Sequence, residues 1–173
     1  MRYHNITKAD MLNGDGLRVV LWVSGCSHAC PGCHNQITWN PKDGLEFDEE
    51  AKNEIFQELE QDWCAGITFS GGDPLFKGNR ATILELAKEI KSKFPTKNIW
   101  CYTGFTWEEL HKEGDPVVME LLEYLDVVLD GKFMLQLKDD NIHYVGSRNQ
   151  RIIDVQASRK ENKIVLFIDN GGI

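Results

Sequence analysis

The sequence predicts an α/β fold, a partial (open) parallel β/α barrel of about six strands, and three observations lead to this prediction. Short apolar runs rich in β-branched residues alternate with segments of helical periodicity along the chain. The runs are too continuously apolar to be half-exposed, which is typical of parallel strands covered by helices. About six strands are also too few for a closed barrel of eight.

The strands are predicted from local sequence character. Leu17–Val23 is short and apolar and ends at a Ser-Gly pair, which is typical of a buried strand. The other predicted strands share this character and are Gly66–Ser70, Asn98–Tyr102, Asp126–Leu129, Arg151–Val155 and Ile164–Ile168. A polar stretch, residues 156–163, separates the last two of them.

Helices are predicted between the strands from capping residues and apolar stripes. Asp48 is a predicted N-cap, and the apolar residues after it fall on one helical face. A second stripe ends at Pro95, which cannot continue a helix. Thr106 and Glu109 have the spacing of a capping box, and Asp115-Pro116 predicts a further helix start.

The composition is that of a globular protein, and we expect a single domain over residues 1–173. The chain has 19 Lys and Arg against 27 Asp and Glu, a formal charge of −8, which argues against a nucleic-acid-binding domain with a basic face. No apolar run reaches the ~18 residues of a membrane span, and the polar start predicts no signal peptide. Five cysteines are an odd number, which fits a disulfide framework poorly and predicts a cytoplasmic protein.

Three cysteines follow the first predicted strand with the spacing C-x3-C-x2-C, namely Cys26, Cys30 and Cys33. In a parallel sheet or barrel the reactive site lies on the loops that follow the strands, so we expect a site here. Glycines and a proline in this loop permit the turns that would let three thiolates converge on one metal centre. Cys64 and Cys101 stand alone in apolar surroundings and are predicted to be buried.

Two kinds of metal centre fit three cysteines. A closed zinc site takes four ligands, usually as two spaced pairs, and the chain has no second pair, although His28 or His34 could supply a fourth ligand. An iron–sulfur cluster normally takes four cysteines, so three would leave one iron open to a substrate. The spacing favours the iron–sulfur cluster.

The motif C-x3-C-x2-C after the first strand of a partial barrel resembles the radical S-adenosylmethionine superfamily. The segment CPGCHNQITW, with NGDGLR upstream, resembles the glycyl-radical-enzyme activases, and within them the activases of anaerobic (class III) ribonucleotide reductases. Further matching stretches are Ser70–Pro74, Tyr102–Gly104, Asp130–Phe133 and Gly146–Asp154. Two departures are Asp15, where the family often has proline, and His34, which instead matches the activases of pyruvate formate-lyase.

The resemblance implies two cofactors, a [4Fe-4S] cluster and S-adenosylmethionine. Cys26, Cys30 and Cys33 would bind the cluster. Gly71 and Gly72 would bring backbone carbonyls close to the amino group of S-adenosylmethionine, since glycine has no Cβ in the way. Asp130 and Lys132 lie two apart on a strand and would point the same way, toward one ligand. The complete set of implied cofactor-binding residues is Gly32, Cys33, His34, Gly71, Gly72, Asp73, Thr103, Asp130 and Lys132.

The resemblance also implies a reaction and partners. An external one-electron donor such as flavodoxin would reduce the cluster, and cleavage of S-adenosylmethionine would give methionine and a 5′-deoxyadenosyl radical. This radical would take a hydrogen from a glycine of the catalytic subunit of the anaerobic ribonucleotide reductase. No catalytic residue beyond the cluster and cofactor is expected. The alternatives are an activase of pyruvate formate-lyase and a non-catalytic zinc-binding interaction protein.

Overall fold

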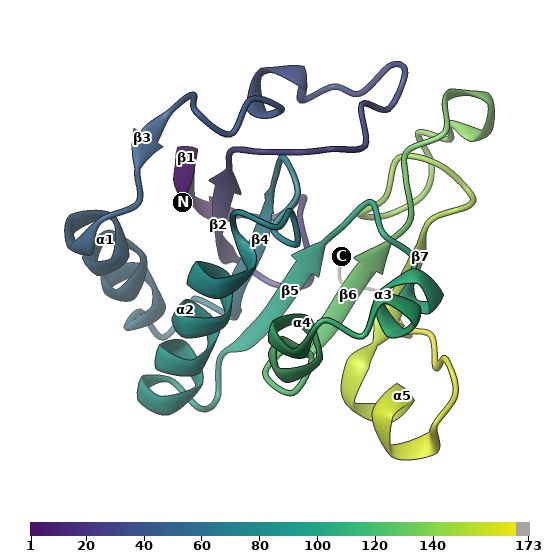
Figure 1. Cartoon of the computed structure of the whole chain (residues 1–173). Helices are drawn as coiled ribbons and strands as arrows, with labels where there is room; N and C mark the ends of the chain where they lie inside the picture. Colours follow the sequence, from purple (N-terminus) through teal and green to yellow (C-terminus); the bar gives the residue numbers. More distant parts are fainter. Residues whose placement is uncertain (169–173) are drawn as a thin grey trace.

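The computed structural model describes residues 1–168 (Figure 1). Strands and helices alternate through the middle of the chain, while the chain begins with a long strand. The elements are β1 (Arg2–Asp10), β2 (Arg18–Val23), the 3₁₀ helix η1 (Gln36–Thr38), β3 (Leu45–Glu46), α1 (Glu49–Leu59), β4 (Gly66–Gly71), α2 (Arg80–Lys93), β5 (Asn98–Tyr102), α3 (Trp107–Glu113), α4 (Pro116–Leu121), β6 (Val127–Asp130), the 3₁₀ helix η2 (Leu135–Leu137), β7 (Arg151–Asp154) and α5 (Val155–Glu161). Within this part of the chain, no helix has the length and apolar character needed to cross a bilayer.

The strands form one seven-stranded mixed sheet in the order β3-β1-β2-β4-β5-β6-β7. The central strands β2, β4, β5 and β6 are parallel, as predicted, and are joined by helical crossovers. The predicted α/β fold is confirmed, but the sheet has seven strands instead of about six and is only partly parallel. The partial barrel remains a prediction. Strands β1, β3 and β7 are antiparallel to their neighbours, because no helical crossover turns the chain back between β1 and β2 or between β6 and β7.

Two strand predictions near the C-terminus are also wrong in part. Ile164–Ile168 makes only an isolated bridge, in which Leu166 pairs with Ile153 of β7. The polar stretch before it, together with Val155, forms helix α5, whose N-cap is Asp154. This helix buries only Val155 and Ser158, so its apolar periodicity is too weak to be seen in the sequence.

The predicted helix starts are confirmed by their hydrogen bonds. The Asp48 side chain accepts from the backbone N–H of Ala51 at the start of α1, at 2.9 Å. Thr106 and Glu109 form a complete capping box at α3, in which each side chain accepts from the other's backbone N–H. Local capping chemistry therefore sets where the helices begin.

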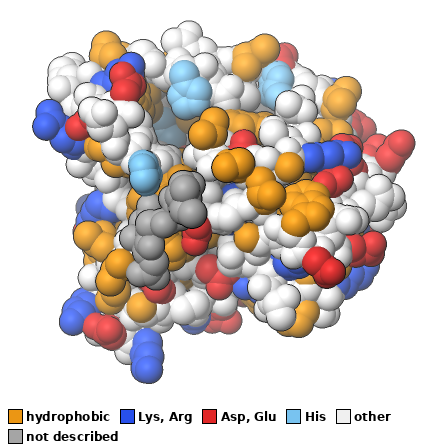
Figure 2. All heavy atoms as spheres, turned by 180° about the vertical axis from the view of Figure 1, so that it is seen from behind, with side chains coloured by type: hydrophobic (Ala, Val, Ile, Leu, Met, Phe, Trp, Pro, Cys, Tyr) orange, Lys and Arg blue, Asp and Glu red, His pale blue; other side chains and the backbone are white. Residues whose placement is uncertain are grey.

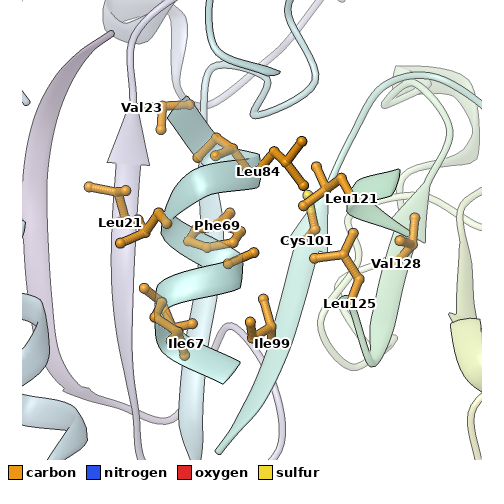
Figure 3. Close-up of a cluster of buried hydrophobic side chains, with 14 of the residues drawn as sticks. Leu21, Val23, Ile67, Phe69, Leu84, Ile99, Cys101, Leu121, Leu125 and Val128 are labelled. Atoms are coloured by element: carbon orange, nitrogen blue, oxygen red, sulfur yellow. The ribbon is translucent and has the colours of Figure 1, made fainter. Parts of the chain in front are cut away.

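The two faces of the sheet have different coverings. Helices α1, α2 and α4 lie in front of the sheet in Figure 1, over a core in which alternate strand residues such as Leu21, Phe69 and Val128 point toward helix residues such as Leu84 and Leu121 (Figure 3). The opposite face, called the inner face below, carries the other alternate residues and a smaller apolar cluster around Trp100, Val127, Leu129 and Val145.

Arg18 is fully buried on the inner face at the start of β2. Its guanidinium donates to Thr68 Oγ1 at 2.7 Å, to the Ile67 carbonyl at 2.9 Å and to Asn98 Oδ1 at 2.7 Å, and it lies over the Trp100 ring. All of these groups are neutral, and burial lowers the pKa of Arg18 to about 10. The side chain therefore ties β2, β4 and β5 together at their amino ends, opposite the edge where the motifs lie.

We expect Arg18→Ala to lower the free energy of unfolding by about 3–5 kcal/mol, because it leaves buried acceptors without donors and opens a cavity. Urea denaturation monitored by circular dichroism measures this loss. The control is Arg159→Ala, which removes an exposed ion pair with Glu123 and should cost less than about 1 kcal/mol. Equal losses in the two variants would contradict the role assigned to Arg18.

Candidate functional site

A cavity lies on the inner face where the four parallel strands end. It measures about 180 Å³ and adjoins a second cavity of about 740 Å³, and His34, Tyr144 and Gly146 line both. Together they reach the size typical of small-molecule sites, about 300–1,000 Å³. The first cavity is lined by Asn13, Trp22, Cys26, His28, Cys30, Cys33, His34, Asn35, Trp39, Ser70, Gly71, Gly72, Tyr102, Thr103, Gly104, Gly131, Lys132, Phe133, Tyr144, Gly146 and Gln150.

The structure brings Cys26, Cys30 and Cys33 together on the wall of this cavity. The two ends of their loop are joined by hydrogen bonds, in which the Gly25 N–H donates to the Thr38 carbonyl at 2.7 Å and the Cys26 N–H donates to the Trp39 carbonyl at 3.0 Å. Cys64 and Cys101 are 2% and 0% exposed and lie in the helix-side core, away from the cavity lining, as predicted.

Burial and backbone donors set the chemistry of these thiols. Burial raises the pKa of Cys26 and of Cys30, while hydrogen bonds from the backbone, at His28 and Ala29 for Cys26 and at Phe133 for Cys30, act in the lowering direction. The N–H of Asn35 donates to Cys33 Sγ at 3.4 Å. Each sulfur thus has a backbone donor beside it, which is the kind of contact that stabilises thiolates bound to an iron–sulfur cluster.

The arrangement of donors fits a cluster better than a single metal ion. Within residues 1–168, no three His, Cys, Asp or Glu side chains are grouped to hold one ion. A four-iron cube differs because each cysteine binds a separate iron, so the sulfurs surround the cluster without meeting at a point. His28, a candidate fourth zinc ligand, instead directs its ring toward Asp73.

Asp73 holds three loops of the site in place. His28 Nε2 donates to Asp73 Oδ2 at 2.6 Å, and Thr103 Oγ1 and the Gly104 N–H donate to the same oxygen at 3.1 and 3.0 Å. The other oxygen accepts from the Leu75 N–H at 2.7 Å. The carboxyl is 1% exposed and does not line the cavity, so the structure shows it positioning the loops.

The sequence indicated His28 only as a possible fourth zinc ligand and not as a partner of Asp73. The His28 side chain is 5% exposed, packs edge-on against Phe105 and lies so close to Gly104 that a Cβ there would be 2.3 Å from the ring. The only signal was a polar aromatic residue between two predicted metal ligands. That signal does not identify Asp73 as its partner, because the two residues are 45 positions apart.

Gly71 and Gly72 line the cavity, and close contacts with the protein backbone already leave no room for a Cβ at either position. A Cβ at Gly71 would lie 2.5 Å from the Val23 nitrogen, and one at Gly72 would lie 2.4 Å from the Gly25 carbonyl oxygen. Larger residues would therefore push β4 away from β2 before they affected any ligand. The prediction that these glycines admit a cofactor amino group remains a prediction.

Asp130 and Lys132 do not point the same way, so this expectation is wrong. Lys132 lines the cavity, whereas Asp130 is fully buried and accepts from the Trp107 N–H at 2.7 Å and from Arg151. The alternation of a strand ends between them because Gly131 has φ +95°, in the left-handed region. Of the other predicted residues, Thr103 and His34 line the cavity and Gly32 does not.

The chain is similar to a known family and to several named proteins. Residues 12–153 match the family described as a 4Fe-4S single cluster domain. The anaerobic ribonucleoside-triphosphate reductase-activating protein of Enterobacteria phage T4 is 40% identical over 152 residues, which cover 88% of this chain and 93% of that protein. The proteins of the same name from Pasteurella multocida and Escherichia coli K12 are 40% and 39% identical, over 88% and 87% of this chain and 96% of each relative.

The chain therefore belongs to the 4Fe-4S single-cluster-domain family and, within it, to the anaerobic ribonucleoside-triphosphate reductase-activating proteins. This confirms the resemblance to the reductase activases that the motifs indicated.

The cysteine assignment predicts which variants lose the cluster. Anaerobic reconstitution of the wild-type protein should give about four iron and four sulfide per chain. Alanine at Cys26, Cys30 or Cys33 should abolish this loading, whereas alanine at the buried Cys64 or Cys101 should leave it in place. Iron and sulfide analysis measures both, and stoichiometric zinc without sulfide in the wild-type protein would contradict the assignment.

Proposed function

We propose that this protein is a radical S-adenosylmethionine enzyme that generates the glycyl radical of an anaerobic ribonucleotide reductase. The observation that carries the proposal is one cavity in which three cysteines from the β2 loop face the ends of β4, β5 and β6. The names of the relatives support the partner, since all are activating proteins of the anaerobic reductase.

Each cofactor has a distinct set of residues in this proposal. Cys26, Cys30 and Cys33 hold the [4Fe-4S] cluster, which leaves one iron for the methionine end of S-adenosylmethionine. The backbone at Gly71 and Gly72 faces the amino group, and Lys132 places a compact positive charge for the carboxylate. When bound, the cluster and S-adenosylmethionine supply a 5′-deoxyadenosyl radical by one-electron reductive cleavage.

The chain's own residues position these groups and exclude water. Trp22, Trp39 and Tyr102 form apolar parts of the wall, and the Tyr102 hydroxyl donates to the Tyr144 carbonyl at 2.5 Å. Burial raises the pKa of Tyr102 above its usual value, so the phenol stays neutral. The proposed reaction moves one electron and one hydrogen atom, so the site needs no general base.

The reductase would meet the open side of the cavity. Acidic and basic side chains are intermixed, with hydrophobic side chains between them, on the face that Figure 2 shows. The formal charge of −8 favours a locally basic docking face on the reductase. We further propose an external one-electron donor such as flavodoxin and a cytoplasmic location, in line with the odd number of free thiols.

The role of Lys132 is tested by binding. Lys132→Ala should weaken S-adenosylmethionine binding about tenfold to hundredfold, since a charged hydrogen bond is worth about 1.5–3 kcal/mol. Equilibrium dialysis with the reconstituted protein measures this, and iron and sulfide content should not change. Lys160→Ala removes an exposed lysine of α5 and is the matched control. Unaltered binding in the Lys132 variant would place the carboxylate elsewhere.

The proposed function itself is tested with the partner. The protein, S-adenosylmethionine, a reductant and a class III reductase, mixed without oxygen, should give a glycyl-radical doublet in electron paramagnetic resonance. Pyruvate formate-lyase in place of the reductase should give little or no signal. A signal with the lyase alone would overturn the choice of partner and keep the chemistry, whereas no cleavage of S-adenosylmethionine would overturn both.

A further inference from the structure

The segment Gly146–Arg151 lies in one of the stretches that resemble the family, and its contacts are now defined. Three consecutive side chains reach across to three consecutive residues, the last residue of β6 and the two that follow it. Arg151 Nε donates to Asp130 Oδ1 at 3.0 Å, Gln150 Nε2 donates to the Gly131 carbonyl at 3.0 Å, and Asn149 Nδ2 donates to the Lys132 carbonyl at 2.8 Å. We call these three contacts the side-chain ladder.

The side-chain ladder extends the antiparallel pairing of β6 and β7 beyond their last backbone pair. Strands β6 and β7 are antiparallel, and their last backbone pair is Asp130 with Arg151. Gly131, with φ +95°, turns the chain out of the strand at this point. The next partners in the same antiparallel register are residues 131 with 150 and 132 with 149, and side-chain amides take over from backbone N–H groups there.

The ladder is itself fixed by further hydrogen bonds. Gln150 Oε1 accepts from the N–H groups of Gly146 and Ser147 at 3.0 and 3.1 Å, which holds its amide with the donor side toward Gly131. The Met134 N–H donates to Ser147 Oγ at 3.1 Å, so the same segment also holds the far side of the Lys132 loop. The loop is thus anchored on both sides of Lys132.

Only one end of the Asn149 side-chain amide forms a hydrogen bond within the described residues. Its Oδ1 is buried and has no hydrogen-bond partner among the described residues, a situation that costs free energy. Its Nδ2 group makes the contact to the Lys132 carbonyl. Lys132 is exposed, so no packing fixes its long side chain. The region that its amine can reach is therefore set by the position of its backbone.

We propose that Asn149 and Gln150 are positioning residues that hold the Lys132 backbone so that its amine faces the ligand in the cavity. They act through Lys132, since Asn149 does not line the cavity and the amide of Gln150, which does, is engaged with Gly131, Gly146 and Ser147. This inference rests on the proposed function for the identity of the ligand, S-adenosylmethionine, while the anchoring of the loop is independent of it.

A double-mutant cycle separates action through Lys132 from other effects. Asn149→Ala alone should raise the dissociation constant for S-adenosylmethionine about threefold to tenfold, the range of one hydrogen bond. In a Lys132→Ala background the same substitution should change it less than about twofold. The maximal rate of cofactor cleavage and the spectrum of the reduced cluster should stay as in the parent, so the effect appears in binding. The matched control is Asn53→Ala, at an exposed position of α1.

Equal losses in the two backgrounds, or no loss in either, would overturn the proposal. A second measurement needs no cofactor, namely amide hydrogen exchange of residues 131–135 in the cluster-free protein. Exchange there should become faster in Asn149→Ala and in Gln150→Ala, and stay unchanged in Asn53→Ala. If exchange is faster in the two variants but the wild-type protein binds no S-adenosylmethionine, the proposed function is refuted and the anchoring stands. Unchanged exchange in the two variants would refute the anchoring.

Discussion

The buried carboxyl of Asp73 is the group on which the geometry of the site depends. It joins the cysteine loop, through His28, to the loops after β4 and β5. These loops come from distant parts of the chain, and the parallel strands alone would bring only their starting points together. Four donors on one carboxyl set the spacing between them, and an internally satisfied carboxyl of this kind is more rigid than one held by water.

The cavity is therefore built from two halves with separate supports. One half, residues 26–39, is closed on itself by the hydrogen bonds of Gly25 and Cys26 to Thr38 and Trp39, and Asp73 holds it to the loops after β4 and β5. The other half, residues 131–150, is held by the side-chain ladder and by the contact of Phe133 with Gly146. Lys132 and Cys30 face each other across the division, and the Phe133 backbone beside the Cys30 thiol is a direct contact between the halves.

Much of the fold could be predicted because its signals are local. The cap at Asp48 and the capping box at Thr106 act within one turn, and the parallel strands are buried on both faces and mostly apolar. Strand β1 was missed because only Ile6 is buried among its nine residues, so no apolar pattern marks it. The motifs that follow the strands correctly predicted where the cavity lies. The turn at Gly131 and the contact of Asn149 with Lys132, 17 residues earlier in the chain, could not be predicted because they depend on tertiary structure.

An open sheet, unlike a closed barrel, leaves two edge strands whose unpaired backbone groups can recruit strands from other molecules. At one edge stands β3, which has only two residues and offers little length for such pairing. At the other edge, β7 is partly capped by the segment around Leu166, whose neighbours exchange backbone hydrogen bonds with Ile152 and Asp154 at 2.8 and 2.9 Å. The two edges are therefore covered unequally, because β7 is partly capped whereas β3 pairs with β1 only at Arg2 and Tyr3 and leaves the rest of that nine-residue strand at the edge of the sheet.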